Sequence, residues 1–431
     1  MSTNLDRYLE KRADLARWPL HAGNVQGLDT VVIVPVYAER ETLPATLDSL
    51  ACNLQTNLDT TLILCVVNNT VQSAPDAVRE NADTLARLDQ AVTGDSPWPA
   101  LRMGYLDASS PGNELPEGEG VGTARKLGMD WAVSVFRDAA MAAGVLISLD
   151  ADTRVETGYL STIKAHFQIS DTWAAVVDYA HPIDGTPEQQ EAILAYELYL
   201  RYHVLGLQHA GSRYAFHTIG STIACTAQAY VAVSGMNRRT AGEDFYFLQE
   251  LAKTGRVDRI RGTVVHPSPR PSDRVPFGTG PKVNTFMEDP ESAYTVYHPE
   301  VYTILQKWLA LAGSGFHTPP NQLLDAAREI APELGQFLEQ ERFVEVIEKL
   351  RDHAPDDATF LRQFHRWFDA LKTLRLIHHL RDTSHPSQDL FRSIETLLHE
   401  TDRTEKAATD MDDRPDPAAR RALLERLRTL A

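Results

Sequence analysis

The sequence predicts an α/β protein whose mostly parallel sheet is followed by a helical C-terminal region. Apolar runs at residues 30–37, 61–67 and 145–149 are rich in Val, Ile and Leu and do not alternate with polar residues. Such runs indicate strands that are buried on both faces, as in a parallel sheet covered by helices. Helical spacing of apolar residues lies between them, and from about residue 290 onward only helical spacing remains.

The first half of the chain alternates between the two periodicities. Strands are expected at residues 30–37, 61–67, 101–106 and 145–149, and helices at 39–50, 74–90 and 123–139. Pro35 is expected to end the first strand. The alternation is typical of a Rossmann-like sheet, whose ligands collect at the carboxyl ends of the strands.

The second half is less regular. Expected there are a strand at 173–179, helices at 187–205, 227–234 and 243–254, a strand or turn at 220–225, and a long functional loop or linker at 266–280. Residues 402–418 are expected to be a loose linker before a last short helix. We expect a helical lead-in at 1–27, an α/β domain at 28–285 and a helical region at 286–431.

Composition limits the possible functions. The chain has 431 residues, 43% hydrophobic content and a formal net charge of -17, which is typical of a soluble protein and disfavours nucleic-acid binding. No apolar run reaches the ~18 residues of a membrane helix, and the N-terminus does not resemble a signal peptide. Cys52, Cys65 and Cys225 are read as buried thiols in a reducing compartment, so a cytoplasmic location is expected.

Two carboxylates, Asp150 and Asp152, follow the apolar run at 145–149. Acids one residue apart at the end of a buried strand are costly unless a cation lies between them. Oxygen ligands of this kind suit Mg²⁺ or Mn²⁺, which keep positions open for substrate phosphates. The alternative is an exposed turn that caps a helix starting near Glu156.

Three further segments carry candidate chemistry. Glycines at 118–128 precede a helix that carries Arg125 and Lys126, an arrangement suited to an anion; a flexible loop with surface basic residues is the alternative. Glu243 and Asp244 lie at the start of another expected helix. One of them could be a general base, and ordinary capping of the helix is the alternative. His266 could be a third metal ligand, and Arg270 and Arg274 could bind a phosphate or carboxylate; structural roles and a solvated loop are the alternatives.

Five short motifs occur in the order seen in glycosyltransferase family 2, which has the GT-A fold. Residues 32–39 resemble the family's opening strand, although Ala38 replaces an Asn, and Asn68-Asn69 stands where the family has acids that contact the base. Residues 122–128 resemble the segment near the donor diphosphate, and 150–152 matches the DxD motif. Residues 220–244 resemble the acceptor half of the family, which ends in a Glu-Asp pair. The resemblance covers about residues 28–270.

The resemblance implies a metal-dependent transfer of a sugar from a nucleotide-sugar to a hydroxyl of a small acceptor, and an acidic acceptor is one option within it. It implies the following roles: a catalytic base at Asp244 with Glu243 beside it; donor contacts at Pro35, Tyr37, Glu39, Asn68, Gly122, Arg125, Lys126 and Asp150; a Mg²⁺ or Mn²⁺ ion on Asp152, Asp150 and His266; and acceptor contacts at Arg270, Arg274 and Ser221. Within the family, the chain resembles the soluble glucosyl- or mannosyl-phosphoglycerate and glycerate synthases. Processive polysaccharide synthases are disfavoured, because no apolar run is long enough for a membrane segment.

Two other readings stay open at this stage. A nucleotidyltransferase that makes sugar nucleotides would share the sheet and the acids, but it should have a Gly-rich phosphate loop after the first strand, and residues 34–39 contain no Gly. A catalytically inactive GT-A module could bind nucleotide-sugars or act as a scaffold. The helical C-terminal region is expected either to close over the acceptor or to pair two subunits into a homodimer.

Overall fold

The computed structural model describes residues 4–169, 171–270, 279–289, 294–400 and 415–431. The chain forms two compact units. The first comprises Met1–Pro182 and Thr218–Pro281, and the second comprises Ile183–His217 and Lys282–Ala431. The expected domain limits, 28–285 and 286–431, stay a prediction. The two units divide the chain differently, because residues 183–217 group with the C-terminal helices.

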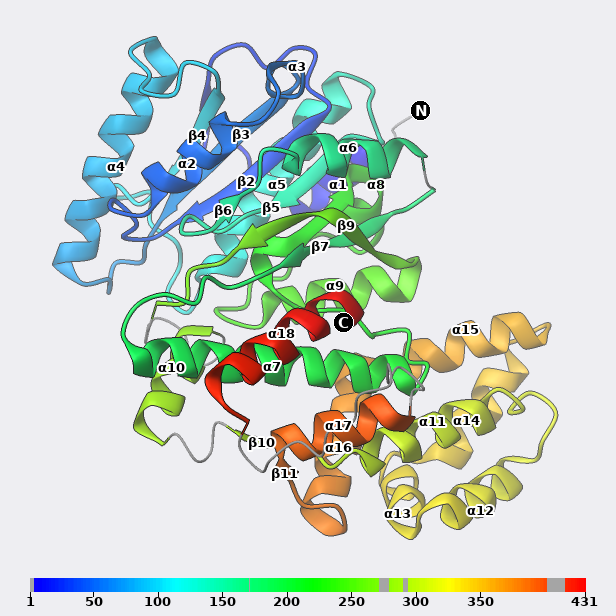
Figure 1. Cartoon of the computed structure of the whole chain (residues 1–431). Helices are drawn as coiled ribbons and strands as arrows, with labels where there is room; N and C mark the ends of the chain where they lie inside the picture. The colour runs from blue at the N-terminus through cyan, green and yellow to red at the C-terminus, as the bar shows by residue number, and fades with distance from the viewer. Residues whose placement is uncertain (1–3, 170, 271–278, 290–293, 401–414) are drawn as a thin grey trace. The chain divides into compact units, whose positions relative to one another are not determined.

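A nine-stranded sheet forms the centre of the first unit, in the order β1-β4-β3-β2-β5-β8-β7-β9-β6 (Figure 1). Its strands are β1 (Leu20–Ala22), β2 (Thr30–Val36), β3 (Thr61–Asn68), β4 (Arg102–Ala108), β5 (Val145–Ser148), β6 (Arg154–Val155), β7 (Ala174–Tyr179), β8 (Ile223–Thr226) and β9 (Val257–His266). The β4-β3-β2-β5 block is parallel, as is the β7–β9 pair. The pairs β1–β4, β5–β8, β8–β7 and β6–β9 are antiparallel. The predicted fold class, a mixed and mostly parallel sheet flanked by helices, is confirmed.

Helices cover this sheet because its central strands are apolar on both faces. Every residue of β2, β3 and β5 is buried. The helices of the unit are α1 (Asn4–Arg12), α2 (Leu43–Ala51), α3 (Gln55–Leu58), α4 (Pro75–Thr93), α5 (Val121–Asp138), α6 (Tyr159–Ile169), α8 (Ala227–Ala232) and α9 (Glu243–Thr254), with a 3₁₀ turn η1 at Gly220–Thr222. Gly128 lets α5 pack closely, since a Cβ there would lie 2.5 Å from Ile33. Helix α5 therefore sits tightly against β2 and β3.

Several local expectations were wrong. Pro35 does not end the first strand; it lies within β2, opposite Val66 of β3, and the strand continues to Val36. The lead-in is not helical throughout, because β1 adds an antiparallel edge strand next to β4. No strand was predicted at residues 257–266, where β9 spans ten residues and includes several charged side chains. Part of the expected loop at 266–280 is the start of helix α10 (Thr279–Glu288).

The second unit is almost entirely helical. Besides α10 it contains α7 (Pro187–His209), α11 (Glu300–Ala312), α12 (Pro320–Ile330), α13 (Pro332–Gln340), α14 (Phe343–Asp352), α15 (Asp357–Trp367), α16 (Ala370–Thr383), α17 (Leu390–Glu400) and α18 (Pro417–Leu430). Its core is aromatic: the fully buried Trp308 makes edge contacts with Phe343, Phe364 and Phe368. The expectation of helix alone from residue 290 was incomplete, because β10 (Thr295–Val296) pairs with β11 (Gln388–Asp389).

Helix starts in the second unit follow the capping chemistry of the sequence. Thr186 and Gln189 form a capping box at the start of α7. The side chains of Asp356, Asp369 and Asp416 accept hydrogen bonds from backbone N–H groups at the starts of α15, α16 and α18. Among the described helices of both units, none is both long and apolar enough to cross a lipid bilayer.

Candidate functional site

The carboxyl ends of the central parallel strands carry the polar residues that the sequence singled out. Asn68 is the last residue of β3, Tyr37 and Glu39 follow β2, and Asp150 follows β5 within two residues. Because β3, β2 and β5 are parallel neighbours, these ends lie at one edge of the sheet. The candidate residues that follow these three strands therefore share one edge of the sheet.

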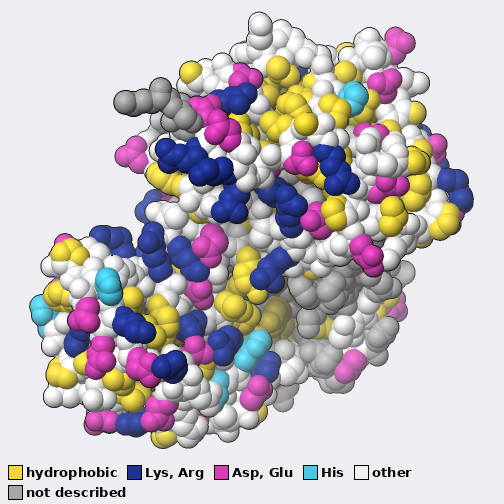
Figure 2. Space-filling model, turned by 180° about the vertical axis from the view of Figure 1, so that it is seen from behind, with side chains coloured by type: hydrophobic (Ala, Val, Ile, Leu, Met, Phe, Trp, Pro, Cys, Tyr) yellow, Lys and Arg dark blue, Asp and Glu magenta, His cyan; other side chains and the backbone are white. Residues whose placement is uncertain are grey.

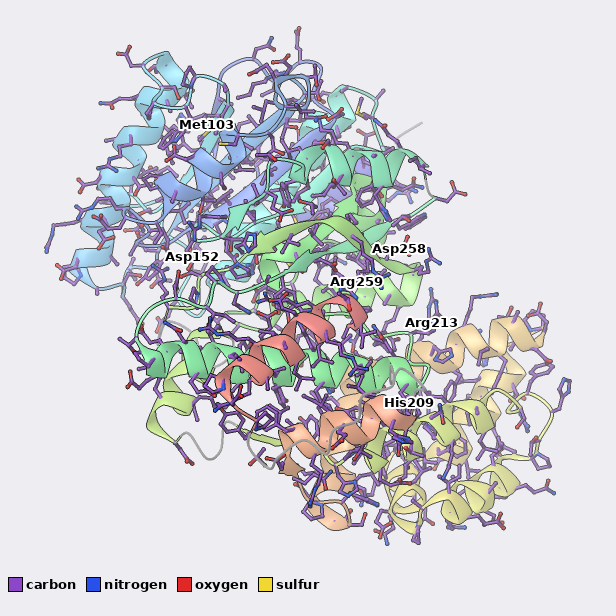
Figure 3. All side chains as sticks on the ribbon, viewed as in Figure 1. Met103, Asp152, His209, Arg213, Asp258 and Arg259 are labelled. Carbon is purple, nitrogen blue, oxygen red and sulfur yellow. The ribbon has the colours of Figure 1, made fainter. Side chains whose placement is uncertain are left out.

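Arg270 joins two acids of this edge. Its Nη2 forms an ion pair with Glu39 and lies 3.1 Å from Oδ2 of Asp152. The Thr42 hydroxyl donates a hydrogen bond to the second oxygen of Glu39. Asp152 is partly exposed. Figure 3 shows that Asp152 lies well away from Asp258 and Arg259, which are near the start of β9. Acids that are 113 residues apart in sequence are thus held by one guanidinium.

Arg125 joins the acids on the other side of the site. Its side chain is only 4% exposed and lies between β5 and α9. Nε donates to Oγ of Ser148 at 3.0 Å, Nη1 pairs with Glu243, and Nη2 pairs with Asp150. A planar guanidinium suits this arrangement because its donors point in fixed directions. The three partners come from a strand, the turn after it and the start of a distant helix.

Helix α9 places an acid pair beside Arg125. Gly242, with a φ of 70°, precedes the helix, and Nδ2 of Asn237 donates to the carbonyl of Glu243 at 2.9 Å. Glu243 is buried and pairs with Arg125, whereas Asp244 is half-buried. Burial raises the pKa of Asp244, although the nearby charge of Arg125 opposes the rise. The two neighbouring acids therefore have different surroundings.

Lys126 points into a separate buried cluster. Its Nζ lies 2.7 Å from Oδ2 of Asp130 and 2.9 Å from the hydroxyl of Tyr8, and Tyr230 donates to Asp130 at 2.7 Å. Burial lowers the pKa of Lys126 and raises that of Asp130. A Cβ on Gly235 would overlap the Tyr8 hydroxyl, so that glycine is needed for the close approach. The cluster ties α1 and α8 to α5.

Asn68 takes part in a network of amides at the end of β3. Its Nδ2 donates to the carbonyls of Val36 and Val66 at 3.1 and 3.2 Å. Asn81 donates to the carbonyl of Asn68 at 3.0 Å and accepts from the backbone N–H of Ala38 at 2.9 Å. Ala38 has a φ of 52°, so this hydrogen bond supports a strained turn after β2. Asn68 contact with a nucleotide base stays a prediction.

The remaining donor-side and acceptor-side candidates lie as follows. Gly122 packs closely against the segment that precedes α9. A Cβ at this position would overlap the carbonyl of Arg239. Pro35 is buried in β2, and Tyr37 is half-buried after it. Ser221 is fully buried in η1, and its hydroxyl has no hydrogen-bond partner among the described residues. Arg274 lies outside the described residues.

A divalent ion fits part of the predicted ligand set. Asp150 and Asp152 supply the oxygen donors that Mg²⁺ and Mn²⁺ prefer, and one or two carboxylates suffice when substrate phosphates complete the coordination. His266 has its Nδ1 3.0 Å from the carbonyl of Ala180 and its Nε2 4.0 Å from Glu156. Among the residues that the structure describes, no group of three or more His, Cys, Asp or Glu side chains is placed to hold an ion. His266 as a third ligand stays a prediction.

Sequence reasoning missed several residues that build this region. Ser148 is the acceptor for Arg125 Nε, and Asn81 supports the turn after β2. Ser148 could have been noticed as a hydroxyl within an apolar strand. Asn81 carried no such signal, because polar residues are common along α4. Lys and Arg side chains are interspersed with Asp and Glu on the one face that Figure 2 shows.

Comparisons with known proteins give only distant likenesses. No protein-family model and no curated protein matches the sequence. Solved structures that resemble it include residues 1–349 of TarS from S. aureus in complex with UDP-GlcNAc, with 11% identity, 79% of this chain and 92% of that chain covered, and a TM-score of 0.39. Another is the mannosyltransferase PcManGT from Pyrobaculum calidifontis in complex with GDP-Man and Mn2+, with 16% identity, 82% and 93% covered, and a TM-score of 0.36. Because these TM-scores lie below 0.5, function has to be argued from the residues of this chain.

Proposed function

We propose that the chain is a glycosyltransferase that moves a sugar from a nucleotide-sugar to a hydroxyl group of a small acceptor. The observation that carries the proposal is the convergence of acids from three distant segments on two arginines. Arg270 holds Glu39 and Asp152, and Arg125 holds Asp150 and Glu243. These are the segments that resemble the opening strand, the DxD motif and the acceptor half of glycosyltransferase family 2.

The charge of this edge supports a nucleotide-sugar together with a cation. With Asp244 included, five carboxyl groups and two guanidinium groups are gathered there. A diphosphate would be repelled by this excess of acid unless a divalent ion came with it. Asp152 would hold such an ion with Asp150, and Arg270 would then be released toward an anionic group of the donor or acceptor. The ion would supply Lewis-acid stabilisation of the leaving diphosphate.

Asp244 is the proposed general base. It lies at the start of α9 next to Glu243, whose carboxylate is already paired with Arg125. Its raised pKa increases its basicity toward a hydroxyl proton while leaving it half-buried and reachable. Glu243 is proposed to support the helix start, and Asp244 to accept the proton of the acceptor hydroxyl.

A donor panel tests the function. Purified protein is incubated with UDP-, GDP- and ADP-sugars, with and without Mn²⁺, and release of the nucleoside diphosphate and transfer to small hydroxyl acceptors are measured by mass spectrometry. We expect one donor to be consumed, with a strong increase when metal is present. Asp152→Asn should abolish consumption, while Asp29→Asn, at the start of β2, should not change it. Consumption of no nucleotide-sugar under any metal condition would contradict the proposal.

A further inference from the structure

We infer that Arg125 is a positioning residue, which fixes the acceptor-side helix α9 to the donor-side carboxylate of Asp150. This inference rests on the proposed function, and it assigns Arg125 a role different from the diphosphate contact that the sequence suggests. Its support is the geometry of one buried guanidinium that holds partners from three segments. Two of the three partners, Ser148 and Glu243, are buried. The third partner, Asp150, is one-third exposed.

The burial of Arg125 argues against direct donor binding. A phosphate oxygen that reached the guanidinium would have to replace one of the buried partners. Breaking a buried ion pair leaves an uncompensated charge, which costs several kcal/mol. The backbone at Gly220 also packs on the guanidinium, since a Cβ there would overlap Nη2. Arg125 is thus enclosed by the fold.

The contact with Glu243 determines where the proposed base stands. Glu243 and Asp244 are consecutive residues in the first turn of α9. Arg125 fixes the side chain of Glu243, and Asn237 fixes its carbonyl. Because the backbone of that turn is held at two points, the carboxylate of Asp244 is held in place relative to Asp150. A donor bound at Asp150 and an acceptor proton taken by Asp244 would then stay aligned.

Gly122 explains how the two segments come so close. It lies one helical turn before Arg125, and a Cβ at this position would lie 3.1 Å from the Cβ of Glu243 and overlap the carbonyl of Arg239. Gly122, in the first turn of α5, therefore allows the close contact between α5 and the start of α9. This contact brings the guanidinium of Arg125 within reach of both acids while its side chain stays buried.

The test compares Arg125→Lys with Arg125→Ala. Lysine keeps the charge but offers a single nitrogen, so it cannot hold three partners in fixed directions. We expect Arg125→Lys to lower the kcat of transfer about 100-fold, the size of effect that a small misplacement produces. The dissociation constant of the nucleotide-sugar should stay within about threefold. The ratio of donor hydrolysis to transfer should rise, because water needs no aligned acceptor. Added guanidinium should partly restore transfer in Arg125→Ala.

A matched control separates positioning from stability. Lys164 is also buried, and its Nζ lies 2.6 Å from Asp29 and 3.1 Å from the carbonyl of Asn57, at the start of the strands. Lys164→Met should lower the melting temperature and leave kcat and the hydrolysis ratio of the folded protein unchanged.

Two results would overturn the inference. The first is an Arg125→Lys protein with wild-type kcat and a weakened nucleotide-sugar affinity, which would make Arg125 a donor ligand. The second is an Arg125→Lys protein that loses only stability, as Lys164→Met does. If the wild-type protein binds no nucleotide-sugar, the proposed function itself fails, and the inference with it.

Discussion

Arg125 and Lys126 are neighbours on one helix, and both are buried and paired with acids, yet they belong to different networks. Arg125 joins β5 to the start of α9 at the carboxyl edge of the sheet. Lys126 joins Asp130, one turn along α5, to Tyr8 of α1 and lies beside Tyr230 of α8. The first network contains the partly exposed Asp150, and the second is closed. A basic pair in a sequence therefore does not reveal which member serves a site; its distant partners do.

The largest effect is expected at the acid that Arg125 positions. Asp244→Asn removes the proposed base with almost no change in volume. We expect transfer to fall about 10²- to 10⁴-fold, the usual contribution of general base catalysis. Nucleotide-sugar affinity should be kept, because the donor contacts are elsewhere. Steady-state kinetics and calorimetry measure the two quantities. Full transfer activity in Asp244→Asn would assign the base to another residue.

The closed network should respond in the opposite way. Lys126→Met leaves Asp130 buried without its ion pair, which typically costs about 3–5 kcal/mol. The raised pKa of Asp130 means that the carboxyl can bind a proton and recover part of this loss. Urea unfolding measures the free energy, and kcat is measured on the folded fraction. A large fall in kcat with unchanged stability would show that Lys126 belongs to the site.

A smaller effect is expected at the second arginine of the edge. Arg270 competes with a cation for Asp152, since its Nη2 lies 3.1 Å from that carboxylate. In Arg270→Ala, Mn²⁺ should bind the protein without nucleotide about tenfold more tightly, a change of about 1.4 kcal/mol. Titration of free Mn²⁺ by electron paramagnetic resonance measures this directly. Weaker Mn²⁺ binding would mean that Arg270 does not oppose the ion. Arg259→Ala, in a strand segment away from Asp152 in Figure 3, is the control.

The smallest effect is a shift of a pH profile. Because burial raises the pKa of Asp244, its deprotonated form is reached only above the ordinary value of about 3.9. Transfer should therefore fall as the pH drops through the raised pKa. The same group lowers stability as the pH rises from its unfolded to its folded pKa, since the native state holds the proton longer. An acidic limb of kcat/KM at the ordinary value would contradict this. The substitution Arg125→Lys should change the pH at which this acidic limb of kcat/KM occurs.

The sheet could be predicted because it rests on local signals. The buried runs of β2, β3 and β5 are apolar on both faces, and their parallel pairing follows from the alternation with helices. The shared edge of Glu39, Asn68 and Asp150 follows from that pairing alone. Strand β9 was not predicted, because its charged residues interrupt the apolar pattern. The pairing of β10 with β11 joins segments about 90 residues apart, which no local pattern reports.

The partners in the site could not be predicted for the same reason. Arg125 and Glu243 are separated by 118 residues, and Arg270 and Glu39 by 231. The sequence gives the residue types, and only the fold decides which carboxylate each guanidinium meets. The division of Arg125 and Lys126 between two networks, and the burial of Arg125, depend on the packing of α5 against α1, α8 and α9. These are properties of tertiary structure.

Calorimetric titration of UDP, GDP and ADP with Mn²⁺ into the wild-type protein, Asp152→Asn and Asp29→Asn tests the central claim most directly. A nucleoside diphosphate keeps the base and the diphosphate of the donor, so binding should not depend on the sugar. We predict that one nucleotide binds at a single site of the wild-type and Asp29→Asn proteins, and that binding is lost in Asp152→Asn. Equal binding by all three proteins, or none by the wild type, would contradict a nucleotide-sugar site at the carboxyl edge of this sheet.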